Sequence, residues 1–286
     1  MEVGDFSVKD KIIVVTGGGS GINLAFTRLA ASHGAKIVIA DLRLTQEAEE
    51  FKADRKNVVF EPCDVTKWAD LENLITVSEK TFGDVPDCYI AGAGIFDPPW
   101  SSFWDDTAVD RYAEVEVNVN HPIKLTQIAI RTCQKKGKQG VVAILASVGG
   151  YLATFPTPVY CATKHAMVGF TRSLAEANAA AGVKVACICP GVVFTPLFTT
   201  YPDKVEQYSI REETALSPDD VASCLLSLVE DGQYGGGTVL EITRRGTRVV
   251  PAVDLGPRME IPKEVREKMH APVIRKLKEQ RRKSVT

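Results

Sequence analysis

Three residues of types that move protons lie close together in the sequence: Ser147, Tyr160 and Lys164. Tyr160 and Lys164 are four residues apart in a stretch that we expect to be helical, so their side chains lie on one face, one turn apart. An ammonium group beside a phenol lowers the pKa of the phenol and makes it a proton donor and acceptor. A serine hydroxyl can hold a carbonyl or alcohol oxygen. Each residue alone has a plainer interpretation, as a strand end or a helix edge, but the three together predict a proton-transfer site.

A glycine-rich turn near the N-terminus is the second candidate. The mostly apolar residues 11–15 indicate a strand buried on both faces, and it is followed by Thr16-Gly-Gly-Gly-Ser-Gly21. Residues 22–33 have the apolar spacing of a helix. Such a strand, turn and helix let backbone N–H groups approach a pyrophosphate at the helix N-terminus.

The next apolar run, residues 35–40, ends at Asp41. A carboxylate at this place would hydrogen-bond a ribose 2′-hydroxyl and repel a 2′-phosphate. Position 20 is not basic and Leu42 follows the aspartate, so the sequence favours NAD over NADP, although Arg43 leaves NADP open. The plainer interpretation of Asp41 is a turn former at a strand end.

Apolar runs and amphipathic stretches continue to alternate along the chain. Seven strands alternating with helices predict an α/β fold, doubly wound, with a parallel sheet of about seven strands and helices on both faces. We expect one domain over residues 1–245 and a C-terminal extension with a basic tail over residues 246–286. The further predicted strands are 57–61, 88–91, 140–146, 183–189 and 238–243, and the further helices are 44–55, 67–82, 107–135, 158–181 and 218–230.

Composition restricts the class of protein. The net charge of −2 argues against nucleic acid as the main partner, and we expect the basic tail to be a solvated end, with nucleic-acid or membrane contact as the alternative. The seven cysteines are scattered without a C-x-x-C pair, and the four histidines lack ligand spacing, so we expect no disulfide framework, no metal site and a reducing compartment. Without a signal-like start or an 18-residue apolar run, the sequence predicts a cytoplasmic protein with no membrane span.

Taken together, these motifs resemble the short-chain dehydrogenase/reductase family, and within it the members similar to hydroxyprostaglandin dehydrogenase. The resemblance covers about residues 8–245 and implies an NAD(P)-binding Rossmann domain. It is carried by Thr16–Ile22, Asp41, Cys63–Val65, Ala91–Gly94, Asn118, Ser147, Tyr160–Lys164 and Pro190–Thr195, in the family's order and spacing.

The resemblance implies a role for each matching residue. Tyr160 would be the general acid/base, Lys164 its partner and a ribose anchor, and Ser147 the group that binds the reacting oxygen. Asn118 would hold a water that relays protons toward Lys164, although Asn120 lies only two residues away. The implied cofactor-binding residues are Gly17, Gly19, Ser20, Gly21, Ile22, Asp41, Asp64, Val65, Ala91, Gly92, Asn118, Tyr160, Lys164, Pro190, Val193 and Thr195.

Two positions depart from the family pattern. The third glycine of the turn is Asn23, where close helix–strand packing usually leaves no room for a side chain. The family's Asn-Asn-Ala-Gly is Ala91-Gly-Ala-Gly94, so the side-chain amides that would brace the central sheet are missing. These changes put cofactor binding in question more than proton transfer.

The substrate site is predicted from two regions. Trp100, Phe103 and Trp104 follow the strand at 88–91, at the edge where open α/β sheets bind ligands, or else they pack only on their own loop. Residues 197–216 follow a Pro-Gly break and could close as a lid, with Phe198, Tyr201 and Tyr208 as its aromatics. Both regions suit a bulky apolar substrate.

We therefore expect an NAD(H)-dependent oxidoreductase that interconverts a secondary alcohol and a ketone of a bulky apolar molecule. The alternatives are an NADPH-dependent carbonyl reductase and a non-catalytic dinucleotide-binding protein. A stripe of small residues, including Ala162, Ala166 and Gly169, permits close helix approach, and the resemblance implies a homodimer or homotetramer that pairs this helix.

Overall fold

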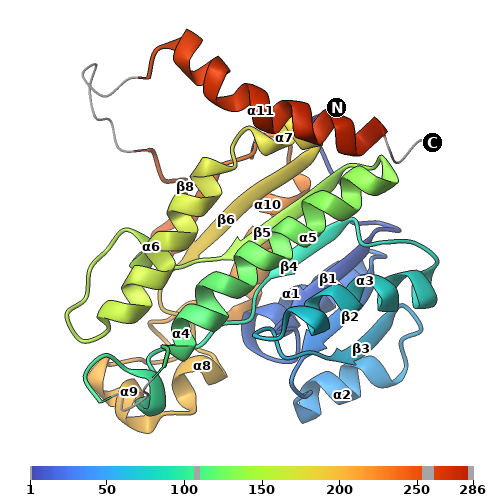
Figure 1. Ribbon diagram of the computed structural model, residues 1–286. Coiled ribbons are helices and arrows are strands. Elements are labelled where there is room, and N and C mark those ends of the chain that lie inside the picture. The colour runs from blue at the N-terminus through green and yellow to red at the C-terminus, as the bar shows by residue number, and fades with distance from the viewer. Residues whose placement is uncertain (1, 106–109, 253–260, 283–286) are drawn as a thin grey trace.

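The computed structural model describes residues 2–105, 110–252 and 261–282. Within them, one sheet of eight strands runs in the order β3-β2-β1-β4-β5-β6-β7-β8 (Figure 1). The strands are β1 (Ile12–Thr16), β2 (Lys36–Asp41), β3 (Val58–Pro62), β4 (Cys88–Ala91), β5 (Gly140–Leu145), β6 (Val183–Pro190), β7 (Val239–Thr243) and β8 (Gly246–Val249).

The first seven strands are parallel, as predicted, and β1 and β4 to β6 are almost completely buried because helices cover both faces. The eighth strand was not predicted. It pairs with β7 in the antiparallel direction through a short turn, and all four of its residues are exposed, so no apolar pattern marks it. The expected domain boundary at 245 lies in this turn, and the division into a domain and an extension stays a prediction.

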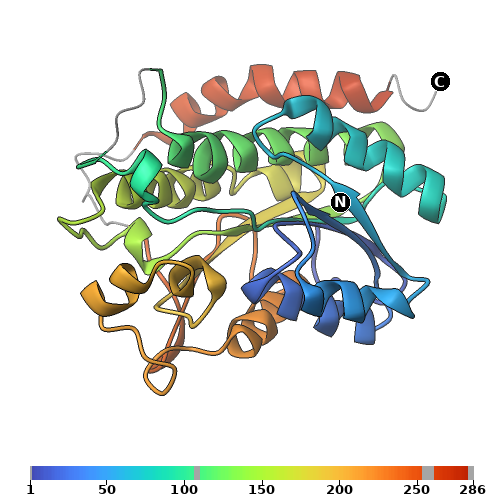
Figure 2. The same cartoon turned by 90° about the horizontal axis from the view of Figure 1, so that it is seen from below.

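Helices form one layer on each face of the sheet (Figure 2). One layer holds α1 (Gly21–Ser32), α2 (Gln46–Ala53) and α10 (Pro218–Glu230). The other holds α3 (Trp68–Phe82), α5 (His121–Lys136) and α6 (Pro158–Ser173). None of the described helices is long and apolar enough to cross a bilayer.

Two predicted helices are interrupted. The helix expected at 107–135 begins as α4 (Ala113–Val115) and a π-helical turn, η2 (Glu116–Asn120), before α5, and residues 106–109 lie outside the described residues. The helix expected at 158–181 ends at Ser173 and resumes as α7 (Ala177–Ala181). The long C-terminal helix α11 (Lys263–Arg282) lies against α5 and α7 (Figure 1).

Short helical turns follow the carboxyl ends of several strands. They are η1 (Pro99–Ser101) after β4, η3 (Val148–Gly150) after β5, and α8 (Pro196–Thr199) and α9 (Pro202–Gln207) after β6. The chain order of the sheet reverses between β1 and β4, and in open α/β sheets this is where ligands bind.

Candidate active site

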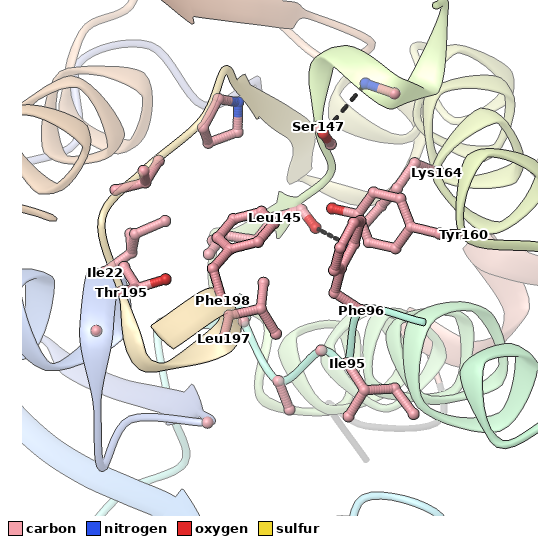
Figure 3. A pocket seen from close by; sticks show the side chains of 18 of the residues that line it. Ile22, Ile95, Phe96, Leu145, Ser147, Tyr160, Lys164, Thr195, Leu197 and Phe198 are labelled. Carbon is pink, nitrogen blue, oxygen red and sulfur yellow. Dashed lines mark hydrogen bonds between the residues drawn. The ribbon is translucent and has the colours of Figure 1, made fainter. Parts of the chain in front are cut away.

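A cavity of about 530 Å³ opens at the carboxyl ends of the central strands (Figure 3). Its wall includes Asp41 at the end of β2, the glycine turn after β1, and Ser147 after β5. It continues to Tyr160 and Lys164 on α6. The predicted glycine turn and the predicted proton-transfer residues therefore line one cavity.

The glycine turn is shaped so that side chains are excluded. Gly17 and Gly21 have φ of +68° and +55°, a region that favours glycine. A Cβ atom on Gly19 would lie 2.9 Å from Oδ2 of Asp41, and the Gly19 N–H donates to that same oxygen at 2.9 Å. The turn thus exposes backbone at the N-terminus of α1, and its residues fit the pyrophosphate of a dinucleotide.

The Asp41 carboxylate accepts a hydrogen bond from the glycine turn and also lines the cavity. Besides the bond from Gly19, its Oδ1 accepts the N–H of Leu42 at 2.7 Å. Asp41 is half-buried and lines the cavity, whereas Arg43 is exposed and does not line it. The charge at the end of β2 is therefore negative on the cavity side.

Ser147, Tyr160 and Lys164 converge from two elements (Figure 3). Ser147 caps η3, and its Oγ accepts the Gly149 N–H at 3.1 Å. Tyr160 and Lys164 lie on one face of α6, with Nζ of Lys164 5.5 Å from the centre of the Tyr160 ring. Nζ also donates to the Leu145 carbonyl at 2.8 Å, which fixes the ammonium group beneath the cavity.

Burial governs the protonation of both α6 residues. It raises the pKa of the Tyr160 phenol, while the Ser147 hydroxyl acts in the opposite direction. Burial also lowers the pKa of Lys164 to about 8. The net pKa shift at Tyr160 is opposite to the sequence-based expectation. Removal of the phenol from water raises its pKa by more than the neighbouring groups lower it.

Asn118 lies behind the cavity wall in η2, at 1% exposure. Its Oδ1 accepts the Ile95 N–H at 3.0 Å, and its Nδ2 donates to the Ile95 carbonyl at 2.9 Å. A Cβ atom on Gly94 would lie 3.4 Å from Asn118 Oδ1 and 3.9 Å from Lys164 Nζ, so both groups approach the same point of the wall. Asn118 itself does not line the cavity, and its water-holding role stays a prediction.

The other predicted cofactor residues fall into two groups. Gly19 and Ala91 lie outside the lining; the Gly19 N–H is bonded to Asp41, and Ala91 is buried within β4. The remaining ones line the cavity: Gly17, Ser20, Gly21, Ile22, Asp64, Val65, Gly92, Pro190, Val193 and Thr195.

The predicted substrate residues are divided in the same way. Phe198 lines the cavity and packs on Phe96, with ring centres 4.8 Å apart. Trp100, Phe103 and Trp104 do not line it, and each is about half exposed. The chain passes through η1 here, and Trp104 Nε1 donates to the Pro156 carbonyl at 3.1 Å, so Trp104 packs against a neighbouring loop.

Phe96 is the aromatic residue that the site brings to Tyr160, and its role was not singled out from the sequence. Its neighbour Asp97 has φ of +37° and is held on two sides. The Asp97 N–H donates to Oε1 of the fully buried Glu114 at 2.6 Å, and its carboxylate pairs with Lys204 of α9. Burial raises the pKa of Glu114 to about 7. The sequence does carry a signal for Glu114, because a residue four positions before Asn118 in a predicted helix lies on the same face, one turn away.

The chain is similar to known proteins over most of its length. Residues 11–206 match the family model described as short chain dehydrogenase. L-fucose dehydrogenase of Bos taurus is 31% identical over 248 residues, 82% of this chain and 88% of that protein. 15-hydroxyprostaglandin dehydrogenase (NAD(+)) of Rattus norvegicus is 28% identical over 257 residues, 82% of this chain and 92% of that protein. Among solved structures, 3-ketoacyl-(acyl-carrier-protein) reductase from Brucella melitensis complexed with NADH is 27% identical, with a TM-score of 0.70 over 83% of this chain and 98% of that chain.

Proposed function

The chain belongs to the short-chain dehydrogenase/reductase family of oxidoreductases that act on CH–OH groups, and on that premise we propose that it uses NAD(H) to interconvert a secondary alcohol and a ketone. The substrate is a bulky apolar molecule. The observation that carries the proposal is the single cavity that joins the glycine turn and Asp41 to Ser147, Tyr160 and Lys164.

The preference for NAD rests on Asp41. A 2′-phosphate would bring negative charge to a half-buried carboxylate that already accepts two backbone N–H groups. Arg43, the residue that would favour NADP, is exposed and lies outside the cavity lining. Gly17, Ser20, Gly21 and Ile22 would hold the pyrophosphate, and Asp64 with Val65 the adenine end.

The chemistry follows from the groups at the other end of the cavity. When bound, the nicotinamide exchanges a hydride with the substrate carbon. Tyr160 takes the proton of the alcohol during oxidation and returns it during reduction, and Ser147 donates a hydrogen bond to the same oxygen. Lys164, with its lowered pKa, passes the proton onward from Tyr160, and water held at Asn118 carries it toward solvent.

The apolar character of the substrate rests on the wall that faces Tyr160. This part of the cavity is lined by Phe96 and Leu152 and, from the predicted lid, by Leu197, Phe198, Tyr208 and Ile210. Such a wall gives a polar substrate few hydrogen-bond partners, so an apolar group beside the reacting carbon is favoured. The NAD preference makes oxidation of the alcohol the proposed direction.

We also propose a homodimer or homotetramer in the cytoplasm. Ala162, Ala166 and Gly169 form an exposed stripe on α6, and a Cβ atom on Gly169 would meet nothing within 4 Å. A second helix can therefore approach this face closely. All seven cysteines are free and buried, which suits a reducing compartment. Light scattering of the purified protein tests the assembly, and a monomeric mass would contradict it.

Cofactor titration tests the proposal directly. We expect NADH fluorescence to change on binding, with a Kd at least about tenfold below that of NADPH, equivalent to about 1.4 kcal/mol. A panel of secondary alcohols then identifies substrates by NADH production. Tighter binding of NADPH would support the carbonyl reductase alternative. NADH binding without turnover of any alcohol or ketone in the panel would favour a non-catalytic dinucleotide-binding protein.

A further inference from the structure

We propose that Asn23 is a positioning residue for the cofactor, because its side chain joins the glycine turn to the end of β4 through space left free by Gly92. This inference rests on the proposed binding of NAD(H). Relative to the family pattern, Asn23 adds a side chain and Gly92 lacks one. In the structure these two residues are in contact, so the two changes lie at a single site.

The Asn23 side chain is buried at the start of α1, with 7% exposure. Its Nδ2 donates to the carbonyl of Gly92 at 2.9 Å. Its Oδ1 is buried and has no hydrogen-bond partner among the described residues. The amide thus makes one bond, across 69 positions of sequence, between the first turn of α1 and the residue that follows β4.

The space around this amide admits only one side chain. A Cβ atom on Gly92 would lie 2.3 Å from Asn23 Oδ1 and 2.5 Å from its Cγ, distances that no packed structure contains. A Cβ atom on Gly17 would lie 3.1 Å from Asn23 Nδ2 and 2.7 Å from Cα of Ala93. The glycine turn, α1 and the end of β4 therefore meet at Asn23.

The Gly92 peptide is held from both sides. Its N–H donates to Oγ1 of Thr16 at 3.0 Å, and its carbonyl accepts from Asn23. Thr16 ends β1 and Asn23 lies in the first turn of α1, so the two bonds clamp Gly92 against both sides of the glycine turn.

The consequence is specific to cofactor binding. Gly17, Gly21, Gly92 and Asn23 all line the cavity, so the clamp sets the spacing of the two backbone segments that a dinucleotide would touch. Ser147, Tyr160 and Lys164 are not bonded to Asn23. Loss of the amide should therefore raise the Kd for NADH and the KM for NAD, with little change in kcat at saturating cofactor.

The experiment is a loss-and-rescue test at positions 23 and 92, read by NADH fluorescence and thermal unfolding. We expect Asn23→Ala to raise the Kd about tenfold, since one buried hydrogen bond is lost and the Gly92 carbonyl is left unpaired. Gly92→Asn alone should bind at least as weakly because of the overlap. The double variant Asn23→Gly/Gly92→Asn, which supplies the amide from the other side, should return to within about threefold of the wild-type Kd.

Asn178→Ala is the matched control. Asn178 is also buried, at 8% exposure, and its Nδ2 donates to the Val3 carbonyl at 3.1 Å, outside the cavity lining. It should lose stability without losing NADH affinity. If Gly92→Asn does not fold, folding of the double variant is itself the rescue.

Three results would overturn the inference. They are wild-type affinity in Asn23→Ala, an equal loss of affinity in Asn178→Ala, and a double variant that is no better than Gly92→Asn. Failure of the wild-type protein to bind NADH is a different result, because it would refute the proposed function itself.

Discussion

The Phe96 ring meets the Tyr160 ring edge-on, with centroids 4.7 Å apart and planes at 81°. Both chain neighbours of Phe96 are fixed: Ile95 is bonded to Asn118 and Asp97 to Glu114. Asn118 and Glu114 are four residues apart and belong to one continuous stretch, α4 and η2. The setting of the phenol thus depends on buried polar residues that do not themselves line the cavity.

Tyr160→Phe tests the proton-transfer role. Removing the hydroxyl leaves the ring and its contact with Phe96 intact, so we expect kcat to fall at least about 10³-fold while the Kd for NADH stays within about twofold. Steady-state kinetics and NADH fluorescence measure the two effects. Tyr89→Phe removes a phenol hydroxyl that is buried in β4 and away from the cavity, and it should keep wild-type turnover. Retained activity in Tyr160→Phe would exclude the role.

Two substitutions of Asp41 separate its charge from its hydrogen bonds. Asp41→Asn can still accept the Gly19 N–H and only loses the charge, so we expect NADPH affinity to rise about tenfold with little loss of NADH affinity. Asp41→Ala also loses the acceptor, and NADH affinity should fall together with thermal stability. Fluorescence titration with both cofactors gives the four constants. An unchanged preference in Asp41→Asn would show that the charge does not select the cofactor.

Local patterns were enough to predict much of the fold and of the site. Buried apolar runs separated by amphipathic stretches gave seven parallel strands, because burial on both faces of a sheet leaves that pattern. The four-residue spacing predicted that Tyr160 and Lys164 share one helical face. The order of the motifs predicted that Ser147 lies near them, and all three residues line one cavity. β8 was missed because its exposed residues carry no apolar pattern.

Contacts between distant segments could not be predicted. The sequence presents Asn23 only as a departure from the glycine turn, whereas in the structure its amide is hydrogen-bonded to Gly92, 69 positions away. The predicted lowering of the Tyr160 pKa considered only the neighbouring lysine, whereas burial, which depends on the whole fold, acts in the opposite direction. For Trp100, Phe103 and Trp104 the sequence left two interpretations, a place in the cavity wall or packing on their own loop, and in the structure they lie outside the cavity lining.

Glu114→Gln tests the buried carboxyl group behind Phe96. The pKa of Glu114 is raised from 4.5 to about 7, chiefly by burial. The charge of Asp97 also raises it, whereas the hydrogen bond from the Asp97 N–H and the charges of Lys164 and Lys204 lower it. Between these pH values the folded protein keeps a proton that the unfolded chain releases. The stabilisation is therefore complete below pH 4.5 and is lost as the pH rises through 7.

A glutamine remains neutral at every pH and can still accept the Asp97 N–H. We expect Glu114→Gln to match the wild type in free energy of unfolding near pH 5 and to exceed it by about 2 kcal/mol at pH 8. Urea unfolding at both pH values measures the difference. A difference that does not depend on pH would show that Glu114 does not titrate in this range.

Lys204→Met tests whether α9 holds the substrate side of the cavity. Lys204 pairs with the Asp97 carboxylate, which is 3% exposed. Phe198 precedes Lys204 in the sequence and Tyr208 follows it, and both aromatic rings pack on Phe96. Removal of one partner from a buried pair costs about 3 kcal/mol, so stability should fall and the KM for substrate should rise. The Kd for NADH should not change, because Lys204 does not line the cavity.

The second variant, Asp97→Asn/Lys204→Met, removes the uncompensated charge and should regain most of the stability of Lys204→Met. Glu206→Gln, on the exposed side of the same short helix, is the control and should behave as wild type. Thermal unfolding and substrate KM are measured for all three proteins. If KM stays constant while stability falls, the ion pair supports the fold alone. A rise in KM that persists in the double variant shows that α9 must be tied to Asp97 for the substrate wall to form.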